Sequence, residues 1–269
     1  MEKYNLIKGD CIEKLKEMDN KSIDCIITSP PYNIDLKYNK YKDKKPHEQY
    51  LEWIYDIFVE VKRVLKDDGH IFLNIGYTNI NPYISIEIAL KLKDLFVLQN
   101  KITWIKSISI GDNSHGHFKP INSKRFITPT NEDIYHFTKS GNESIDRKSI
   151  GVPYKDKSNL KERNKKINKT GEIKEDKRCK GNSWFIPYET ITNKEKQKGN
   201  HPATYPVELV KNCIYLLNKT EGIILDIFVG SGTTLKAIKN INENEKYNFF
   251  GIGIDIDEKY LEYARQSVV

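Results

Sequence analysis

The chain has 269 residues and a net charge of +7, and its 38% hydrophobic and 30% charged residues are typical of a folded globular protein rather than a disordered one. No apolar run approaches the roughly 20 residues needed to cross a bilayer, and the N-terminus MEKYNLIKGD lacks the basic and then apolar layout of a signal peptide. The cysteines (Cys11, Cys25, Cys179 and Cys213) form no CxxC pair, so neither a metal site nor a disulfide framework is indicated, and we expect a cytoplasmic protein.

Strands and helices alternate in the first part of the chain. We expect strands at 4–8, 23–28 and 70–75, and helices at 12–18, 50–65 and 84–92. The helix at 50–65 carries apolar side chains along one side and is expected to stop at Asp68-Gly69. Strands that alternate with helices in this way favour a parallel sheet with crossover helices.

Regular patterning is lost in the middle of the chain. Segments 101–109 and 133–139 are strand-like and could pair antiparallel at a sheet edge. Residues 140–199 are rich in Lys, Asn and Gly, with one apolar island at 184–186, and we interpret them as an inserted region. Residues 151–200 hold fourteen Lys and Arg against seven Asp and Glu, an excess equal to that of the whole chain. This block predicts a surface that faces a polyanion.

Regular structure resumes in the last part of the chain. We expect helices at 205–217 and 233–240 and strands at 222–228 and 249–254, with Pro206 at the start of the first helix.

The strand at 23–28 ends in a stiff turn, Ser29-Pro30-Pro31-Tyr32. Neither proline can donate a backbone hydrogen bond, and each holds the residue before it in an extended conformation. The turn therefore presents one hydroxyl and one phenol ring at a fixed place. A rigid loop with an exposed aromatic residue is the alternative interpretation.

A second motif, LDIFVGSGTT at residues 225–234, predicts a strand, a glycine turn and a helix. Glycines let the backbone approach a ligand closely, and the helix N-terminus offers unpaired N–H groups. Asp255 ends the next strand about 20 residues later, where an acidic residue binds ribose hydroxyls in nucleotide-binding sheets. A dinucleotide fingerprint would have a third glycine where Leu235 stands. An ordinary joint between a strand and a helix is the alternative.

Together these motifs resemble those of amino-methylating DNA methyltransferases. DIFVGSGTT is similar to their S-adenosylmethionine motif and TSPPYN to their catalytic motif, and the segments 184–187 and 201–206 add to the likeness. The catalytic motif comes first in this chain and the cofactor motif last, which resembles the circularly permuted group usually called β-class. The resemblance implies a Rossmann-like α/β fold with a mostly parallel, seven-stranded sheet.

The resemblance also implies three functional parts. Residues 1–139 would form the catalytic half, 140–199 a target-recognition region and 200–269 the cofactor-binding half. The implied cofactor is S-adenosylmethionine, without a metal, and the implied partner is double-stranded DNA. A cognate restriction endonuclease, a monomeric or homodimeric state and a prokaryotic or phage origin would fit the family.

Site residues follow from the matched motifs. The catalytic set is Ser29, Pro30, Pro31 and Tyr32, where Ser29 and the Pro30 carbonyl would accept the hydrogens of a base amino group and Tyr32 would stack on an extruded base. Asp10 is expected to bind the cofactor's adenine and His201 and Pro202 its methionine end, with a turn carboxylate and a helix cap as the respective alternatives. The remaining cofactor residues are Asp226, Phe228, Gly230, Gly232, Thr233 and Asp255, and the DNA-binding candidates are Arg163, Lys165, Lys166 and Arg178.

The serine at the first motif position bears on the base that is methylated. In this family Ser is commoner in cytosine-N4 enzymes and Asp in adenine-N6 enzymes, so Ser29 favours cytosine, with adenine as the alternative. No cysteine follows a proline, which argues against methylation of cytosine carbon-5. Two other classes stay open: an NAD-linked oxidoreductase, against which Leu235 argues, and a non-catalytic basic nucleic-acid-binding protein on the same fold. RNA or a protein glutamine amide would be a related substrate, but the basic insertion favours DNA.

Overall fold

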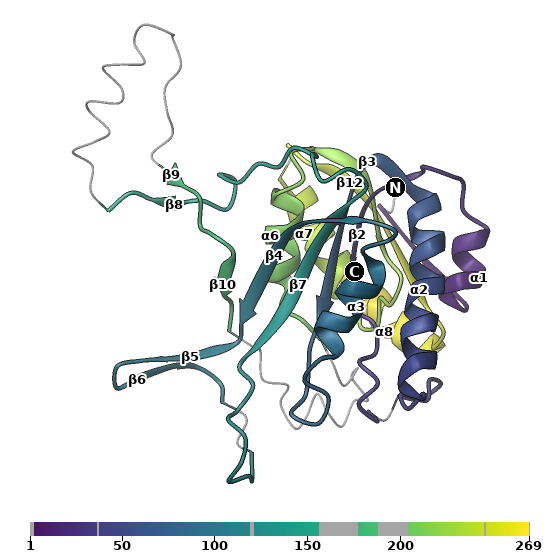
Figure 1. Cartoon of the computed structure of the whole chain (residues 1–269). Helices are drawn as coiled ribbons and strands as arrows, with labels where there is room; N and C mark the ends of the chain where they lie inside the picture. The colour runs from purple at the N-terminus through teal and green to yellow at the C-terminus, as the bar shows by residue number, and fades with distance from the viewer. Residues whose placement is uncertain are drawn as a thin grey trace, which may run out of the picture.

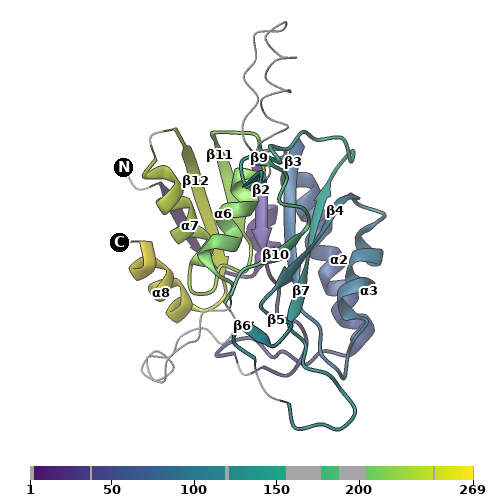
Figure 2. The same cartoon turned by 90° about the vertical axis from the view of Figure 1, so that its left-hand side faces the viewer.

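The computed structural model describes residues 3–36, 38–118, 121–155, 177–187, 204–244 and 246–268. Its centre is a sheet of eight strands (Figures 1 and 2). In spatial order they are β1 (Tyr4–Lys8), β12 (Asn248–Asp255), β11 (Glu221–Asp226), β2 (Ile23–Thr28), β3 (Leu65–Ile75), β7 (Asn131–Thr138), β4 (Val97–Ile105) and β10 (Ser183–Phe185). All neighbours are parallel except β7, which is antiparallel to both β3 and β4.

Helices cover both faces of the sheet, which gives three layers (Figure 2). One hydrophobic core lies under α1 (Cys11–Lys16), α2 (His47–Val64) and α3 (Ile84–Leu92). A second core lies under α6 (Val207–Tyr215), α7 (Thr233–Asn242) and α8 (Glu258–Val268). Strand β2 is buried along its whole length because it feeds both cores, Ile26 into the first and Cys25 and Ile27 into the second. The predicted α/β fold is confirmed.

The predicted helix stop at Asp68-Gly69 is wrong. Helix α2 ends at Val64, and β3 begins directly at Leu65, whose backbone is extended. The pairing of β2 with β3 jumps from Ile23–Leu65 to Cys25–His70, so Gly69 belongs to an irregularity within the strand. A Cβ atom at Gly69 would lie 2.7 Å from Leu65 Cδ1, so a glycine is needed here for close packing rather than to end a helix.

Strands β4 and β7 pair antiparallel as predicted, but they do not form the edge of the sheet. The short strand β10 adds to β4 in parallel and makes eight strands rather than the expected seven. Trp104 and Trp184 stand opposite each other in this pairing, and Trp104 Nε1 donates to the Ile186 carbonyl at 2.8 Å. Part of segment 140–199 thus completes the main sheet, and the three-part division of the chain stays a prediction.

Two antiparallel strand pairs stand apart from the main sheet (Figure 1). Strands β5 (Ser107–Ile110) and β6 (Asn113–Gly116) form a projecting, mostly exposed hairpin. The sequence patterns predict one strand at 101–109 and not this hairpin, because β6 has no apolar residue to mark it as a strand. Strands β8 (Val152–Pro153) and β9 (Lys177–Arg178) form the other pair. Among the described residues, no helix has the length and apolar character needed to span a membrane.

Two buried histidines link the central strands β3 and β7. Asn100 Nδ2 lies 2.9 Å from His136 Nδ1, so this ring nitrogen must accept, and His136 Nε2 must donate to His70 Nδ1 at 3.0 Å. His136 also stacks on Phe72, with 4.5 Å between ring centroids. Burial, followed by the charge that His70 would carry, lowers the pKa of His136 to about 3, and burial lowers the pKa of His70.

This pair predicts that the protein loses stability in mild acid. Folding holds the pKa of His136 below its ordinary 6.5, so the unfolded chain takes up protons that the native chain refuses, and stability present above pH 6.5 declines as the pH falls toward 3. At pH 5 His136 lowers the free energy of unfolding by about 2 kcal/mol relative to its value above pH 6.5. Thermal unfolding between pH 7.5 and 5 measures it.

The test variant is His136→Phe, which keeps the stacked ring, and the control is His115→Gln on the exposed hairpin. The first should be less stable at neutral pH but depend less on pH, and the second should follow the wild type. An unchanged pH dependence in His136→Phe would contradict this assignment.

Candidate active site

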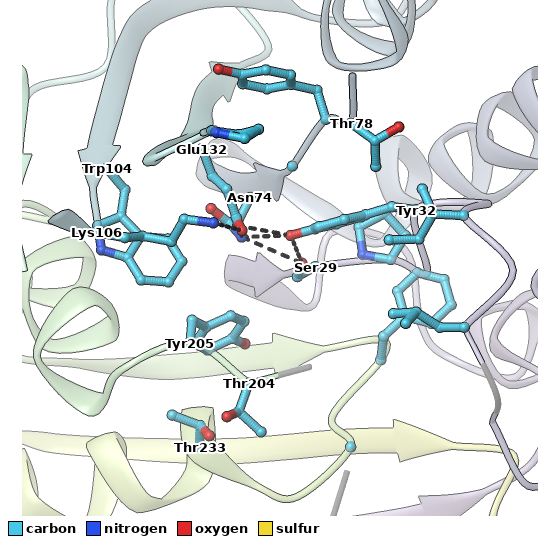
Figure 3. Close-up of a pocket in the computed structure, with 18 of the residues that line it drawn as sticks. Ser29, Tyr32, Asn74, Thr78, Trp104, Lys106, Glu132, Thr204, Tyr205 and Thr233 are labelled. Carbon is cyan, nitrogen blue, oxygen red and sulfur yellow. Dashed lines mark hydrogen bonds and ion pairs between the residues drawn. The ribbon is translucent and has the colours of Figure 1, made fainter. Parts of the chain in front are cut away.

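A cavity of about 730 Å³ opens at the carboxyl ends of the central parallel strands (Figure 3). This is the edge at which open α/β sheets bind ligands, and the volume suits a cofactor or substrate. Its walls include the turn after β2, the segment after β3, the ends of β4 and β7 that meet there, the segment before β7, the residues before α6 and the turn after β11. The two sequence motifs therefore face one space.

The turn at Ser29-Pro30-Pro31-Tyr32 is held by a bond from α2. Tyr50 Oη, on a side chain buried in the core, donates to the Pro31 carbonyl at 2.6 Å. Ser29, Pro30 and Tyr32 line the cavity. Among the described residues, no backbone N–H donates to the Pro30 carbonyl.

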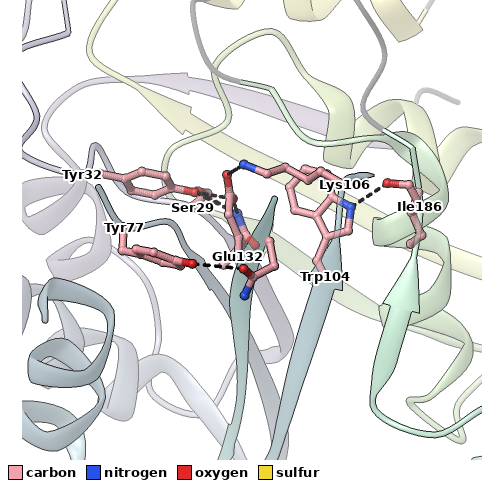
Figure 4. Close-up of polar contacts among 9 residues, drawn as sticks. Ser29, Tyr32, Tyr77, Trp104, Lys106, Glu132 and Ile186 are labelled. Carbon is pink, nitrogen blue, oxygen red and sulfur yellow. Dashed lines mark hydrogen bonds and ion pairs between the residues drawn. The ribbon is translucent and has the colours of Figure 1, made fainter. Parts of the chain in front are cut away.

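Polar side chains from β3, β7 and the turn after β2 meet at the hydroxyl of Tyr32 (Figures 3 and 4). Ser29 Oγ lies 2.8 Å from Tyr32 Oη, which donates to Glu132 Oε2 at 3.0 Å. Asn74 Nδ2 lies 2.8 Å from both Tyr32 Oη and Glu132 Oε2. Lys106 Nζ pairs with Glu132 Oε1 at 2.9 Å. We call these five residues the Tyr32 network.

The ring of Tyr32 has its place because residue 76 is a glycine. A Cβ atom at Gly76 would lie 2.5 Å from Tyr32 Cε2, closer than such atoms approach in proteins. Burial, followed by the charge of Glu132, raises the pKa of Tyr32 well above its usual value, so the phenol stays protonated. The side chain therefore combines a fixed ring with an O–H donor.

Asp226 holds the glycine turn in place through hydrogen bonds. Its buried carboxylate accepts hydrogen bonds from the side chains of Thr28, Tyr205 and Thr234 and from the Phe228 N–H. Burial raises its pKa although these donors oppose the shift. Asp226, a predicted cofactor residue, thus lies beneath the turn, and its carboxylate oxygens are taken up by the protein's own donors.

The turn itself presents backbone to the cavity. Gly230 and Thr233 line the cavity, and Gly230 has φ of +49°. Gly232 also has positive φ, +85°, and a Cβ atom there would lie 2.7 Å from Ala264 Cα, so this glycine serves the packing of α7 against α8. Helix α7 starts at Thr233, which brings its unpaired N–H groups to the cavity wall.

Asp255 holds the far side of the same turn. Its oxygens accept from the backbone N–H of Gly230 at 3.0 Å and of Asp257 at 2.8 Å. Burial raises its pKa to about 6. Each oxygen retains a second lone pair, so the carboxylate can still accept from a ligand hydroxyl.

An aromatic series ties the two motifs together. Phe228, which lines the cavity, lies 5.8 Å from the Trp53 ring, and Trp53 stacks on Tyr41 at 5.6 Å. The loop that carries Tyr41 is organised by Asp43, which accepts from the N–H groups of residues 33, 34 and 36. Trp53 packs directly against the turn.

Other predicted residues lie elsewhere. Asp10 caps α1, with Oδ1 accepting from the Ile12 N–H at 2.9 Å and the Glu13 N–H at 3.3 Å, which matches the alternative of a turn carboxylate. Arg178 is exposed in β9, outside the cavity lining. His201, Pro202, Arg163, Lys165 and Lys166 fall outside the described residues. Within the described part of the chain, no group of three His, Cys, Asp or Glu side chains could hold a metal.

The sequence patterns missed Asn74, Lys106, Glu132 and Tyr205. Asn74 gave the clearest signal, because it is a polar residue near the end of the buried strand β3. Glu132 lies at the start of β7, where an acidic residue before an apolar run looks like an ordinary surface residue.

Comparison with known proteins agrees with this geometry. Residues 23–266 match the family model described as DNA methylase. The type II methyltransferase M.HpaI of Haemophilus parainfluenzae is 31% identical over 270 residues, which cover 98% of this chain and 73% of the relative. M.BglII of Bacillus subtilis, also a type II methyltransferase, is 28% identical over 97% of this chain and 68% of its own length.

The fold has a counterpart among solved structures. The PvuII DNA methyltransferase, described as cytosine-N4-specific, superposes with a TM-score of 0.69 at 19% identity, covering 99% of this chain and 86% of that one.

Proposed function

We propose a specific reaction for this chain, which belongs to the DNA methylase family and is an amino-group DNA methyltransferase. It transfers a methyl group from S-adenosylmethionine to the exocyclic N4 amino group of cytosine in double-stranded DNA. The observation that carries the proposal is that Ser29-Pro30 and the Phe228–Thr233 turn line one cavity. Two substrates can therefore meet there.

The cavity fits S-adenosylmethionine. Thr233 and Gly230 place backbone and a helix N-terminus on the wall, and Asp255 beside them retains lone pairs for ribose hydroxyls. The cofactor supplies a methyl group activated by its bond to a sulfonium. In this proposal Phe228, Gly230, Thr233 and Asp255 contact the cofactor, while Asp226 and Gly232 hold the turn in shape.

The residues of the catalytic turn act on the base. An exocyclic amino group is a weak nucleophile because its lone pair is delocalised into the ring. Ser29 Oγ and the Pro30 carbonyl accept its hydrogens and so turn the lone pair toward the methyl group. The target nitrogen is out of reach inside a duplex, so the base is extruded and stacks on Tyr32. Much of the rate then comes from alignment of nitrogen and methyl.

Cytosine is the base we favour, because Ser29 occupies the first motif position. The PvuII enzyme, which shares the fold, is described as cytosine-N4-specific. Adenine N6 is the alternative, and one relative, YhdJ of Escherichia coli, is described as a DNA adenine methyltransferase at 25% identity. A non-catalytic DNA-binding role is disfavoured by the cavity that joins both motifs.

Segment 140–199 is the proposed target-recognition region. Of its four candidate contacts Arg178 is described, and it is exposed on β9 beside exposed Lys177. In Figure 1 β8 and β9 lie on the opposite side of the molecule from α1 and α2. The proposal includes a cognate restriction endonuclease, because several relatives are named type II methyltransferases. A cytoplasmic location and a monomeric or homodimeric state complete it.

Cofactor binding should depend on the turn. Gly230→Val should abolish binding of S-adenosylmethionine, because a side chain would enter the wall at positive φ. Asp255→Ala should weaken it, because ribose hydrogen bonds are removed. Calorimetry on variants that unfold cooperatively measures both. Gly111→Val at the open hairpin tip, also at positive φ, is the control and should bind normally. Unchanged affinity in both turn variants would contradict the assignment.

The product should be N4-methylcytosine, identified by mass spectrometry of digested DNA. Ser29→Ala should slow single-turnover methyl transfer with little change in affinity for DNA or cofactor, because its hydrogen bond matters most as the amino group changes geometry. Ser22→Ala, directly before β2 and outside the cavity lining, is the control. N6-methyladenine would overturn the base assignment, and full activity of Ser29→Ala would remove that serine from the mechanism.

The basic segment should govern DNA affinity. Replacing Lys165, Lys166, Lys177 and Arg178 by Gln should weaken DNA binding and flatten its salt dependence by about one unit for each phosphate that is no longer neutralised. Cofactor affinity should not change. Lys16→Gln with Lys62→Gln, on exposed positions of α1 and α2, is the control pair. Fluorescence anisotropy at several salt concentrations measures the dependence of DNA affinity on salt. If this dependence has the same slope in all the proteins, the basic residues of segment 151–200 do not contact DNA.

A further inference from the structure

The orientation of hydrogens in the Tyr32 network is fixed by its chemistry. Tyr32 Oη donates to Glu132 Oε2, and a phenol has only one hydrogen to give. The contact of 2.8 Å between Ser29 Oγ and Tyr32 Oη must then use the hydrogen of Ser29. The series therefore runs from Ser29, which donates to Tyr32, to Tyr32, which donates to Glu132, and ends at the Glu132 carboxylate as acceptor.

Glu132 is held as the charged end of this series. Three donors surround its carboxylate: Asn74 and Tyr32 at Oε2 and the ammonium of Lys106 at Oε1. The two ion-pair side chains are only 14% and 23% exposed, so water screens the pair weakly. If the side-chain amide of Asn74 were rotated by 180°, its Oδ1 would face Glu132 Oε2, and two acceptor oxygens would oppose each other. The Nδ2 of Asn74 therefore points toward Glu132.

This order leaves Ser29 with an exposed acceptor. Because the hydroxyl hydrogen of Ser29 is committed to Tyr32, Oγ can only accept further hydrogen bonds; one lone pair faces Asn74 Nδ2 at 3.5 Å, and the other is available to the cavity. A base amino group placed there would donate to Ser29, as the proposed function requires, and would join its hydrogen to a continuous path that ends on a carboxylate.

We propose that Glu132 is the terminal acceptor of the proton released in methyl transfer, a role that rests on the proposed function. The nitrogen lone pair forms the bond to the methyl carbon, and the bond from carbon to sulfur breaks with its electron pair left on sulfur. The nitrogen, now positive, gives one proton to Ser29 Oγ. The hydroxyl hydrogen of Ser29 passes to Tyr32 Oη and that of Tyr32 to Glu132, which becomes a neutral acid. Solvent later takes this proton, and Lys106 favours the return of the carboxylate.

The assignment separates two roles of one tyrosine. The ring of Tyr32 serves the base, whereas its hydroxyl serves the proton. Tyr32→Phe removes only the second role, and Glu132→Gln removes the acceptor while it preserves size and polarity. Both variants interrupt the same path, so their effects should not add.

Single-turnover methyl transfer to duplex DNA, with DNA and cofactor affinities measured separately, tests the path. Tyr32→Phe and Glu132→Gln should each slow the methyl-transfer step at least tenfold, with affinities within about twofold of wild type, and the double variant should be no slower than the slower single one. Glu143→Gln, a loop carboxylate outside the cavity lining, is the control.

The outcomes separate the two proposals. A wild-type protein that methylates no DNA would contradict the proposed function, and the proton path would fall with it. An active wild type with an equally fast Glu132→Gln, or with a double variant whose losses multiply, would contradict the path alone. So would a loss in Glu132→Gln that weaker DNA binding explains in full.

Discussion

The hydrogen bond of 2.8 Å from Thr28 Oγ1 to Asp226 Oδ1 joins residues 198 positions apart in the chain. Thr28 ends the strand before the catalytic turn, and Asp226 ends the strand before the glycine turn. The two strands are neighbours in the sheet, and the bond sets their ends level. Because Asp226 is buried, its remaining donors must also stay in place, since an unpaired donor there would be costly. This contact therefore places both turns against one cavity.

Much of this arrangement could be predicted from the sequence, because the strongest signals are local. The apolar run of β2, the prolines after it and the glycines after β11 each act on a few adjacent residues. The stop expected at Gly69 failed because a bulge between strands depends on a partner that is distant in sequence. The eighth strand was missed for the same reason: the 184–186 island becomes β10 only because the edge of β4 is there to receive it.

The cavity residues that the sequence concealed share a topological cause. Strand β7 runs against its neighbours, so its first residues arrive where the parallel strands end. That reversal carries Glu132 to the catalytic turn, although 100 positions separate it from Tyr32. Strand β4 runs parallel to β3, and its end brings Lys106 to the same place. Neither residue stands in a motif, and only the order of strands makes them neighbours.

Strand order also explains why one tyrosine can stack on a base and bond through its hydroxyl. A tyrosine held only by its backbone would rotate about its side-chain bonds, and a base would have to select one orientation at an entropic cost. Here Gly76 leaves room for the ring edge, and Ser29, Asn74 and Glu132 hold the hydroxyl. The ring plane is thus set before a base arrives. The close fit of the ring edge against Gly76 does not involve the hydroxyl, so the stacking surface and the proposed proton path rest on separate contacts of one side chain.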